Sequence, residues 1–410
     1  MKKLHRAWAV CLGCTLMLLI GGGLGINAFS VTQPYILAQN GFTNTQTSMI
    51  ITVRSVSILL CLFLTPWYYR LFSYRTGTAL ATGLAAVSFL LFANARSLWV
   101  YYLAGAMAGF SHGLGSMVPA TILMTRWFRE NRALAVGICS AGTGLAAVVF
   151  SPVLTLLIER FSLHTCFTVE ALISLVAAAL VYVLVRNSPE ACAMQPYGAA
   201  QEESAQARRL HEIHPGALRW AMLYLGMAFL GAIASPGFAH MTILFTSSGF
   251  SSLQASSALS IFGFALMAGK VIYGAVCDRA GCVKTNWIFA AMLLTGIGLC
   301  ALAGLQSSAL MYLASILYGA GVPLSTVGLS VWATDFSKPA QMAKRVQQFQ
   351  LCYAAGSLIF SFMPGMFADL TGSYAPSYLV FFLFGVFSIA VVQSTYRLGS
   401  RAARQGAEEF

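Results

Sequence analysis

Between Arg6 and Arg397 the sequence consists of apolar runs of about twenty residues, separated by short polar segments. The hydrocarbon core of a bilayer is roughly 30 Å thick, and a helix of about 20 apolar residues spans it. A backbone in that core must satisfy its own hydrogen bonds, which a helix does within one segment. Dividing the chain on this basis predicts twelve spanning helices, at about 7–31, 46–68, 76–95, 98–125, 132–158, 165–186, 218–246, 252–276, 285–305, 308–333, 345–370 and 375–397.

The composition supports the same fold class, an all-α membrane protein. Of the 410 residues, 58% are hydrophobic and only 9% are charged, whereas roughly a quarter of the residues of a soluble domain are charged. The net charge of +12 does not indicate nucleic-acid binding, because the basic residues form short clusters between apolar runs and no stripe with interleaved aromatic residues. The first apolar run is also longer than the roughly 7–15 residues of a cleaved signal peptide, so we predict an uncleaved first helix.

The distribution of lysine and arginine predicts the orientation. If both termini are cytoplasmic, 20 of the 24 basic residues fall in cytoplasmic segments, two in outer loops (Arg96 and Arg160) and two within spans (Arg54 and Lys270). Cytoplasmic loops carry an excess of these residues in membrane proteins. We therefore predict a multi-pass protein of the plasma (inner) membrane with both termini in the cytoplasm.

The longest hydrophilic stretch follows the sixth span and divides the chain into six spans and six. We expect a first bundle at 1–186, a cytoplasmic connecting loop at 187–217, a second bundle at 218–398 and a cytoplasmic tail at 399–410. The halves resemble each other, since "RENRALAVGICSAGTGL" (129–145) and "AKRVQQFQLCYAAGSL" (343–358) both place basic residues before an apolar stretch and an Ala-Gly pair. Such halves are typical of transporters that move two bundles around a site near the membrane midplane.

Neither a metal site nor a cofactor is expected. Cys11 and Cys14 have the CxxC spacing, but they lie in the first span without a second pair or a nearby histidine, and two ligands cannot complete a tetrahedral zinc site. Nearly all the other cysteines lie in apolar runs, where cysteine acts as a small hydrophobic residue. The sequence contains no G-x-x-x-x-G-K-S/T loop for nucleotide phosphates, which argues against ATP-driven transport.

The segment "GAVCDRAG" (274–281) resembles the G-x-x-x-D-R/K-x-G signature of the major facilitator superfamily, at the expected place between the eighth and ninth spans. Gly274, Asp278, Arg279 and Gly281 carry the match. The equivalent loop of the first half, "PWYYRLFSYRTG" (66–77), lacks both the glycine and the aspartate. The resemblance extends over essentially the whole chain and implies a fold of two six-helix bundles that work by alternating access, with these residues acting in gating.

A second segment resembles the monocarboxylate porters and oxalate–formate exchangers of that superfamily. In "RWFRENRALAVGICSAG" (126–142) the matching residues are Trp127, Phe128, Arg132, Leu134, Ala135, Gly137, Ala141 and Gly142, while Glu130, Asn131 and Cys139 depart. "FSVTQPYILAQNGFTNTQTS" (29–48) is similar to the end of their first helix and the entry to their second. The resemblance implies transport of mono- or dicarboxylates such as lactate, pyruvate, oxalate or formate, as symporter or exchanger. It also assigns Arg132 to the gating motif.

Lys270 lies inside an apolar run, eight residues before Asp278. A lysine at the centre of a membrane helix costs roughly 2.5–3.5 kcal/mol, so it faces the bundle interior or water and needs an anionic partner. In the monocarboxylate porters a substrate-binding arginine stands four residues before the glycine equivalent to Gly274, so the resemblance implies that Lys270 binds a carboxylate. Alternatively, Lys270 extends toward the cytoplasmic surface. The acid that those porters use for proton coupling is replaced here by Leu266.

Arg54, in the second span, is the other intramembrane cation, and we expect it either to contact the anion or to pair with Glu170 of the sixth span. The second cation of the oxalate exchangers, on helix eleven, is replaced here by "YAAG" (353–356). His112 can bind a carboxylate or shuttle a proton, since histidine titrates near neutral pH, or it can be satisfied by a neighbouring carbonyl. The other polar or aromatic groups that we expect to line the cavity are Gln33, Asn27, Gln350, Tyr353 and His240.

Two alternatives to anion transport remain open: efflux of amphipathic drugs through the Met- and Phe-rich helices, and an anion sensor that binds without transport. A membrane-embedded acyltransferase with His112 as base is not expected, because Ser111 and Ser116 have no orienting carboxylate nearby. The sequence therefore predicts a transporter and not an enzyme. Its expected partners are a small carboxylate, the lipid bilayer, and a coupled proton or counter-anion, with no nucleic acid.

Overall fold

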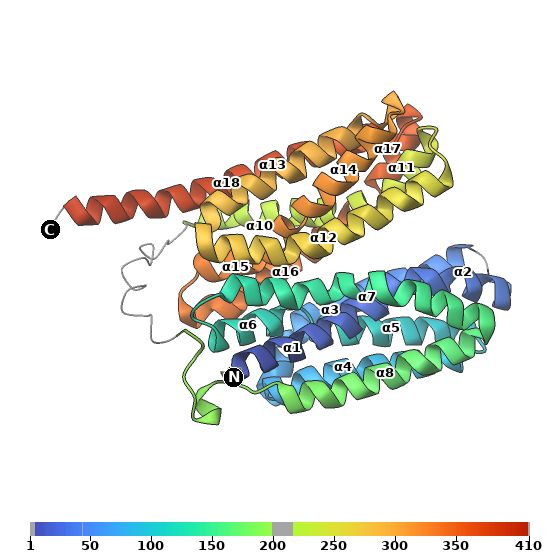
Figure 1. Ribbon diagram of the computed structural model, residues 1–410, viewed down its shortest axis with the longest axis horizontal. Helices are drawn as coiled ribbons and strands as arrows, with labels where there is room; N and C mark the ends of the chain where they lie inside the picture. The colour runs from blue at the N-terminus through green and yellow to red at the C-terminus, as the bar shows by residue number, and fades with distance from the viewer. Residues whose placement is uncertain (1–4, 43, 199–215, 409–410) are drawn as a thin grey trace. The chain divides into compact units, whose positions relative to one another are not determined.

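The computed structural model describes residues 5–42, 44–198 and 216–408. The chain forms two compact helical units, Met1–Ala199 and Ala200–Phe410, which we call the N-terminal and C-terminal units. Within each unit the helices run roughly alongside one another (Figure 1). In the described residues, eleven helical stretches are long and apolar enough to cross a membrane.

The N-terminal unit begins with one continuous helical run in which a π-helical segment, η1, interrupts the α-helix. Serine side chains cap the starts of later helices: Ser73 accepts a hydrogen bond from the Thr76 amide, and Ser162 from the Thr165 amide, as helix N-caps commonly do. The elements are α1 (Arg6–Leu18), η1 (Leu19–Ala28), α2 (Phe29–Asn40), α3 (Asn44–Leu71), α4 (Tyr74–Ala93), α5 (Leu98–Leu114), α6 (Met117–Trp127), α7 (Arg132–Arg160), α8 (Leu163–Leu184) and η2 (Glu190–Cys192).

The C-terminal unit also carries a π-helical segment in its first helical run, and a second one in its fourth. Its last helix, α18, continues through the predicted tail as far as Glu408 and extends past its neighbours in Figure 1. The elements are α10 (Ala217–Ala232), η5 (Ile233–Gly237), α11 (Met241–Ser247), α12 (Ser252–Ala280), α13 (Cys282–Ala301), η6 (Ala303–Leu305), α14 (Ser308–Gly321), η7 (Leu324–Gly328), α15 (Leu329–Asp335), η8 (Pro339–Gln341), α16 (Met342–Ile359), α17 (Met363–Thr371) and α18 (Ala375–Glu408).

The predicted span at 98–125 is divided into two helices, α5 and α6. Neither is among the helices long enough to cross a membrane, so the described residues contain eleven candidate spans and not the predicted twelve. Helix α5 ends at Leu114, and Gly115 caps it. Ser116 then has an extended backbone, and its hydroxyl accepts a hydrogen bond from the Val118 amide at the start of α6. The apolar pattern continues across this break, so hydropathy alone could not reveal it.

Three glycines at four-residue spacing on α5 bring the backbone of α3 very close. A Cβ atom on Gly109 would lie 2.5 Å from the Arg54 carbonyl oxygen, and one on Gly105 would lie 3.0 Å from the Ile50 carbonyl oxygen. Gly113 meets the side chain of Cys61 in the same way. Small residues of this kind allow membrane helices to approach closely. This contact buries one face of α3, and Arg54 lies on that helix.

The polar segment after α8 folds back onto the N-terminal unit as far as it is described. The Arg75 amide donates to Asn187 Oδ1 (2.9 Å), and the Tyr197 amide donates to the Trp127 carbonyl (2.8 Å). The ring of Tyr197 also packs against the ring of Trp8. The remainder of the predicted connecting loop, 199–215, lies outside the described residues.

Candidate functional site

Arg54 occupies a buried position on α3, with 7% of its surface exposed. Its Nη1 donates a hydrogen bond to the Gly25 carbonyl oxygen (2.9 Å), and its guanidinium carbon lies 5.2 Å from the centre of the Phe29 ring. Its Nε is buried and has no hydrogen-bond partner among the described residues. Arg54 is therefore anchored by one carbonyl and one aromatic ring, both uncharged, and retains a free donor.

The π-helical segment η1 explains why a carbonyl on the first helix is accessible to Arg54. In a π-helix the backbone bonds run from residue i to i+5, and such segments are frequent at functional sites. The sequence of η1, LIGGGLGINA, contains four glycines. Gly25 lies on this segment, and among the described residues the nearest atom to the place where its Cβ would be is the Ile20 carbonyl oxygen, at 3.7 Å, so there is room for a large donor beside Gly25.

His112 lies on α5 against the same π-helical segment. A Cβ on Gly22 would stand 3.0 Å from His112 Cε1 and 2.9 Å from Thr143 Cγ2, so only glycine fits there without a shift. Within the described part of the chain, the Nδ1 atom of His112 is buried without a hydrogen-bond partner, and the ring is within electrostatic range of Arg54. The neighbouring-carbonyl alternative therefore does not account for Nδ1. Arg54 and His112 bring two unused nitrogen atoms to the same part of the N-terminal unit.

Glu170, on α8, is 1% exposed. It was the predicted alternative partner of Arg54, but within the described residues the two side chains form no ion pair, and the Glu170 Oε2 atom has no hydrogen-bond partner. The arginine instead reaches the π-helical segment, which sequence reasoning did not anticipate. Of the two expectations for Arg54, only contact with an anion remains.

In the C-terminal unit, Lys270 lies on α12 and is 5% exposed. The adjacent Gly269 packs against α14 and the residue before η7: its Cβ would stand 2.9 Å from the Ala320 carbonyl oxygen and 3.0 Å from Pro323 Cγ. A buried position does not agree with extension of the side chain to an exposed surface. Lys270 also interacts with another group of the protein, and its burial and charge are the features that bear on anion binding.

The remaining predicted lining residues differ in their surroundings. His240 is half-buried beside η5, and its Nδ1 lies 2.9 Å from the Pro236 carbonyl oxygen, so a local contact already engages that nitrogen. Gln350 and Tyr353 lie half-buried on α16, where the Tyr353 carbonyl presses closely against Gly231 of α10.

Two further predicted lining residues fall on the first helical run. Asn27 lies on η1 and Gln33 on α2, but their side chains are outside the described part of the structure.

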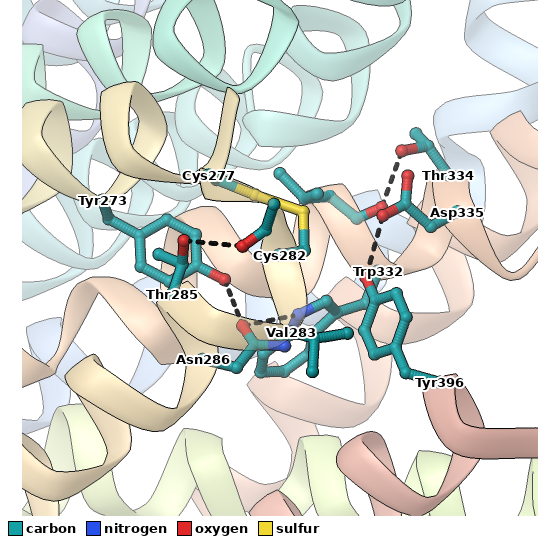
Figure 2. The surroundings of a disulfide bond; sticks show 12 residues. Tyr273, Cys277, Cys282, Val283, Thr285, Asn286, Trp332, Thr334, Asp335 and Tyr396 are labelled. Atoms are coloured by element: carbon teal, nitrogen blue, oxygen red, sulfur yellow. Dashed lines mark hydrogen bonds between the residues drawn. A yellow bond between two sulfur atoms is a disulfide. The ribbon is translucent and has the colours of Figure 1, made fainter. Parts of the chain in front are cut away.

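The predicted gating motif covers the last turns of α12 and Gly281, the residue between α12 and α13, and a disulfide joins Cys277 of α12 to Cys282 of α13 (Figure 2). Asp278 and Arg279 are exposed between the two cysteines. Gly281 has φ of 82°, a conformation that favours glycine, and its amide donates to the Cys277 carbonyl (3.0 Å). Cys277 and Cys282 lie just outside the predicted spans at 252–276 and 285–305, so the expectation for cysteines in apolar runs did not cover this pair. The C-x₄-C spacing around the motif was the sequence signal that could have predicted this disulfide.

Buried hydrogen bonds tie the helix ends around this motif together. Asn286 Oδ1 on α13 accepts from the Tyr273 hydroxyl of α12 (2.7 Å) and from Trp332 Nε1 of α15 (3.2 Å), as Figure 2 shows. The Tyr396 hydroxyl of α18 donates to Asp335 Oδ2 (2.8 Å). In the N-terminal unit, Arg132 is the first residue of α7 and is half-buried.

The comparisons with known proteins agree with this architecture. A family described as Major Facilitator Superfamily matches residues 14–344. Monocarboxylate transporter 12 of Xenopus laevis is 23% identical over 407 residues, which cover 92% of this chain and 88% of the relative. The human protein of that name is 25% identical over 402 residues, covering 91% and 77%.

Solved structures of similar fold were also found. The proton:xylose symporter XylE, bound to 6-bromo-6-deoxy-D-glucose, has a TM-score of 0.69 at 17% identity, covering 94% of each chain. The human organic anion transporter MFSD10 (TETRAN) has a TM-score of 0.67 at 14% identity, covering 96% of this chain and 100% of that one. At these identities the likeness concerns the fold alone.

Proposed function

This chain belongs to the major facilitator superfamily, and from that premise we propose that it is a secondary carrier of small organic anions. The predicted family and fold class are confirmed, and the chain is a multi-pass membrane transporter and not an enzyme. The proposed cargo is a mono- or dicarboxylate such as lactate, pyruvate, oxalate or formate, carried by alternating access in symport or exchange. The observation that carries this proposal is the uncompensated guanidinium group of Arg54.

A buried guanidinium group stays charged, because arginine is not deprotonated in proteins. The groups that hold Arg54, the Gly25 carbonyl and the Phe29 ring, are neutral, so among the described residues its positive charge has no carboxylate counterpart. A charge in the membrane interior is costly unless it is compensated. A carboxylate is a suitable ligand, because it accepts two parallel N–H bonds in the planar geometry that guanidinium offers.

The free nitrogen atoms define what a ligand would contact in the N-terminal unit. Arg54 Nε is an unused donor, and His112 Nδ1 becomes a second donor when the ring carries a proton there. One carboxylate oxygen at each nitrogen would satisfy both buried atoms. Because Gly21 and Gly22 have no side chains, the ring of His112 can pack against the π-helical segment.

Lys270 is the proposed anion-binding cation of the C-terminal unit. Its burial on α12 and its position four residues before Gly274 support this role, and the relatives of similar sequence are named monocarboxylate transporters. We propose Asn27, Gln33, His240, Gln350 and Tyr353 as further lining residues. Gly274, Asp278, Arg279, Gly281 and Arg132 are the proposed gating residues.

The proposed orientation places both termini in the cytoplasm of a cell whose plasma (inner) membrane holds the protein. Basic residues gather at one end of the N-terminal unit, where Arg186 is within electrostatic range of Arg75 and Arg6. The guanidinium of Arg126 lies over the ring of Tyr74 at the same end (4.7 Å). Such a basic end is expected on the cytoplasmic side.

Counterflow in proteoliposomes tests the proposal. Liposomes loaded with unlabelled lactate, oxalate or formate should accumulate the same radiolabelled anion, and Arg54→Gln should abolish this accumulation. Arg160→Gln is the matched control, since Arg160 is an exposed arginine of the same unit, and it should transport like the wild type. Counterflow that is equal in wild type and Arg54→Gln would overturn the assignment.

The same assay distinguishes the two alternatives. A wild-type protein that moves amphipathic cations but none of the anions would be a drug efflux carrier. A protein whose unfolding temperature rises with oxalate or lactate, but which shows no counterflow, would be an anion sensor.

A further inference from the structure

Glu170 is a buried acid that anion binding does not use. It lies on α8 seven residues after Leu163, where the helix begins, which places it roughly 10 Å along the helix axis. Its neighbours along α8, Phe167 and Ala171, belong to an apolar cluster of the N-terminal unit that includes Leu24 and Phe89. The carboxyl group therefore lies in a stretch of the bundle built from apolar side chains.

No positive charge compensates Glu170 within the described residues. Its Oε2 atom is buried without a hydrogen-bond partner in the described structure, and the buried Arg54 is bound to the Gly25 carbonyl instead. An ionised carboxylate without a partner is so unfavourable in an apolar interior that the group takes up a proton. The arrangement therefore suits the neutral, protonated form of Glu170.

The titratable groups on the surrounding helices do not change this conclusion. Helix α8 packs against α4, α1, α7, α2 and η1. On α8 itself, the buried thiol of Cys166 is within electrostatic range of Glu170, whereas His164 is exposed. At the same end of the unit, α7 carries the exposed Glu159 and Arg160, and α2 carries Tyr35, whose hydroxyl donates to Glu159 (3.4 Å).

The other titratable groups on those helices lie at the opposite end of the unit. There, Arg75 Nε of α4 donates to the Tyr182 carbonyl of α8 (2.9 Å), and Tyr182 is twelve residues from Glu170, roughly 18 Å along the helix. The groups of this end are Tyr74 and Arg75 of α4, Arg6, Cys11 and Cys14 of α1, and Arg132 and Cys139 of α7. The segment η1 has no titratable side chain.

We infer that Glu170 is the proton-binding site of this carrier and that its proton moves together with the anion held by Arg54. This inference rests on the proposed function. The proton comes from water on one side of the membrane and forms an O–H bond with the carboxylate, and the same bond breaks when the site meets water on the other side. No other reactant is needed.

The charges in the N-terminal unit explain why the two ligands would move together. With a monocarboxylate on Arg54 and a proton on Glu170, the two buried sites carry no net charge. An anion without the proton leaves one buried negative charge, and a proton without the anion leaves one buried positive charge. Both half-loaded states are disfavoured in a membrane interior, so the inference predicts one proton for each monovalent anion.

Glu170→Gln tests the inference because glutamine resembles the protonated acid in shape but cannot release a proton. In proteoliposomes, this variant should keep anion counterflow and lose the accumulation that an inward proton gradient drives. Glu159→Gln, an exposed acid of the same unit, is the matched control and should accumulate the anion like the wild type. Proton-driven accumulation by Glu170→Gln at the wild-type level would overturn the inference.

A second measurement does not depend on knowing the cargo. Infrared difference spectra of the purified protein, taken between acidic and alkaline pH, should show a protonated carboxyl band that is absent from Glu170→Gln. Glu170→Asp keeps a carboxyl group and should retain such a band. This variant therefore still tests the inference if Glu170→Gln does not fold. Wild-type spectra without this band would exclude a proton on Glu170. If the band is present but no anion shows counterflow, the anion proposal fails while the proton site stands.

Discussion

In both units a π-helical segment interrupts the first helical run, but different side chains donate hydrogen bonds to the carbonyls of that segment. In the N-terminal unit the π-helical carbonyl of Gly25 is held by the charged guanidinium of Arg54. In the C-terminal unit the carbonyls of Ile233 and Gly237 on η5 accept from the hydroxyls of Tyr318 (2.5 Å) and Tyr378 (2.7 Å). Neutral hydroxyls complete the C-terminal segment, whereas Arg54 leaves a charge and a donor unused.

This difference indicates a division of tasks between similar bundles. Glycines make η1 open to a large charged side chain, while Pro236 and two tyrosines stabilise η5 internally. The cation of the C-terminal unit, Lys270, lies on α12, where the adjacent Gly269 packs against α14. We therefore expect anion binding in the N-terminal unit to depend on the geometry of Arg54, whereas the proposed role of Lys270 in the C-terminal unit depends mainly on its charge.

Reciprocal exchange of the two cations should give the largest effect. Lysine at position 54 cannot hold the Gly25 carbonyl and also present a planar pair of donors, so Arg54→Lys should lose a charge-assisted hydrogen bond worth about 1.5–3 kcal/mol. Anion affinity should then fall by about tenfold or more. Lys270→Arg keeps the charge and should retain transport. Normal affinity in Arg54→Lys together with loss in Lys270→Arg would reverse the assignment of tasks.

Glycine substitutions should separate tight backbone packing from open surface within the C-terminal unit. A Cβ on Gly231 would run into the backbone of Tyr353, so Gly231→Ala should lower the free energy of unfolding by about 1–3 kcal/mol. Gly263 has open space around it, and Gly263→Ala should be neutral or stabilise helix α12 by up to about 1 kcal/mol. Thermal unfolding in detergent measures both, and equal transitions would show that α10 and α16 are less closely packed than described.

Adding a reductant should affect only one of the two equivalent loops, the loop of the C-terminal unit. The loop between α12 and α13 is closed by the Cys277–Cys282 disulfide, whereas 66–77 of the N-terminal unit contains no cysteine. A disulfide around so short a loop contributes about 2 kcal/mol by loop closure. Mass spectrometry after alkylation should find both cysteines protected until a reductant is added, with a matching fall in unfolding temperature. Alkylation of both without a reductant would contradict the bond.

The smallest expected effect concerns the tyrosines that complete η5. Tyr378→Phe removes the hydrogen bond to the Gly237 carbonyl and should cost about 0.5–1.5 kcal/mol of unfolding free energy. Transport should persist, because this hydroxyl is not among the proposed anion contacts. A variant of wild-type stability that no longer transports would mean that η5, like η1, takes part in the ligand site.

The apolar runs of the sequence were sufficient to predict the fold. The candidate site could be predicted only in part. Nearly every predicted span corresponds to a helix, because the number of apolar residues needed to cross a bilayer is a property of the segment itself. Burial of Arg54 and Lys270 was also foreseeable, since a charged residue in such a run must face the protein interior. The break in the helix at Gly115 was not foreseeable, because Gly115 belongs to a glycine-rich pattern that is helical at its other positions.

What the sequence determined by itself was therefore the helices, the family and the presence of two intramembrane cations. The tertiary structure decided their partners: Arg54 reaches the Gly25 carbonyl, Glu170 has no counter-charge in the part of the chain that the structure describes, and Cys277 bonds to Cys282. Hydropathy depends on single segments, so it can be read along the chain. Hydrogen bonds and ion pairs depend on which helix faces meet within about 3 Å, and only the packed bundle determines that.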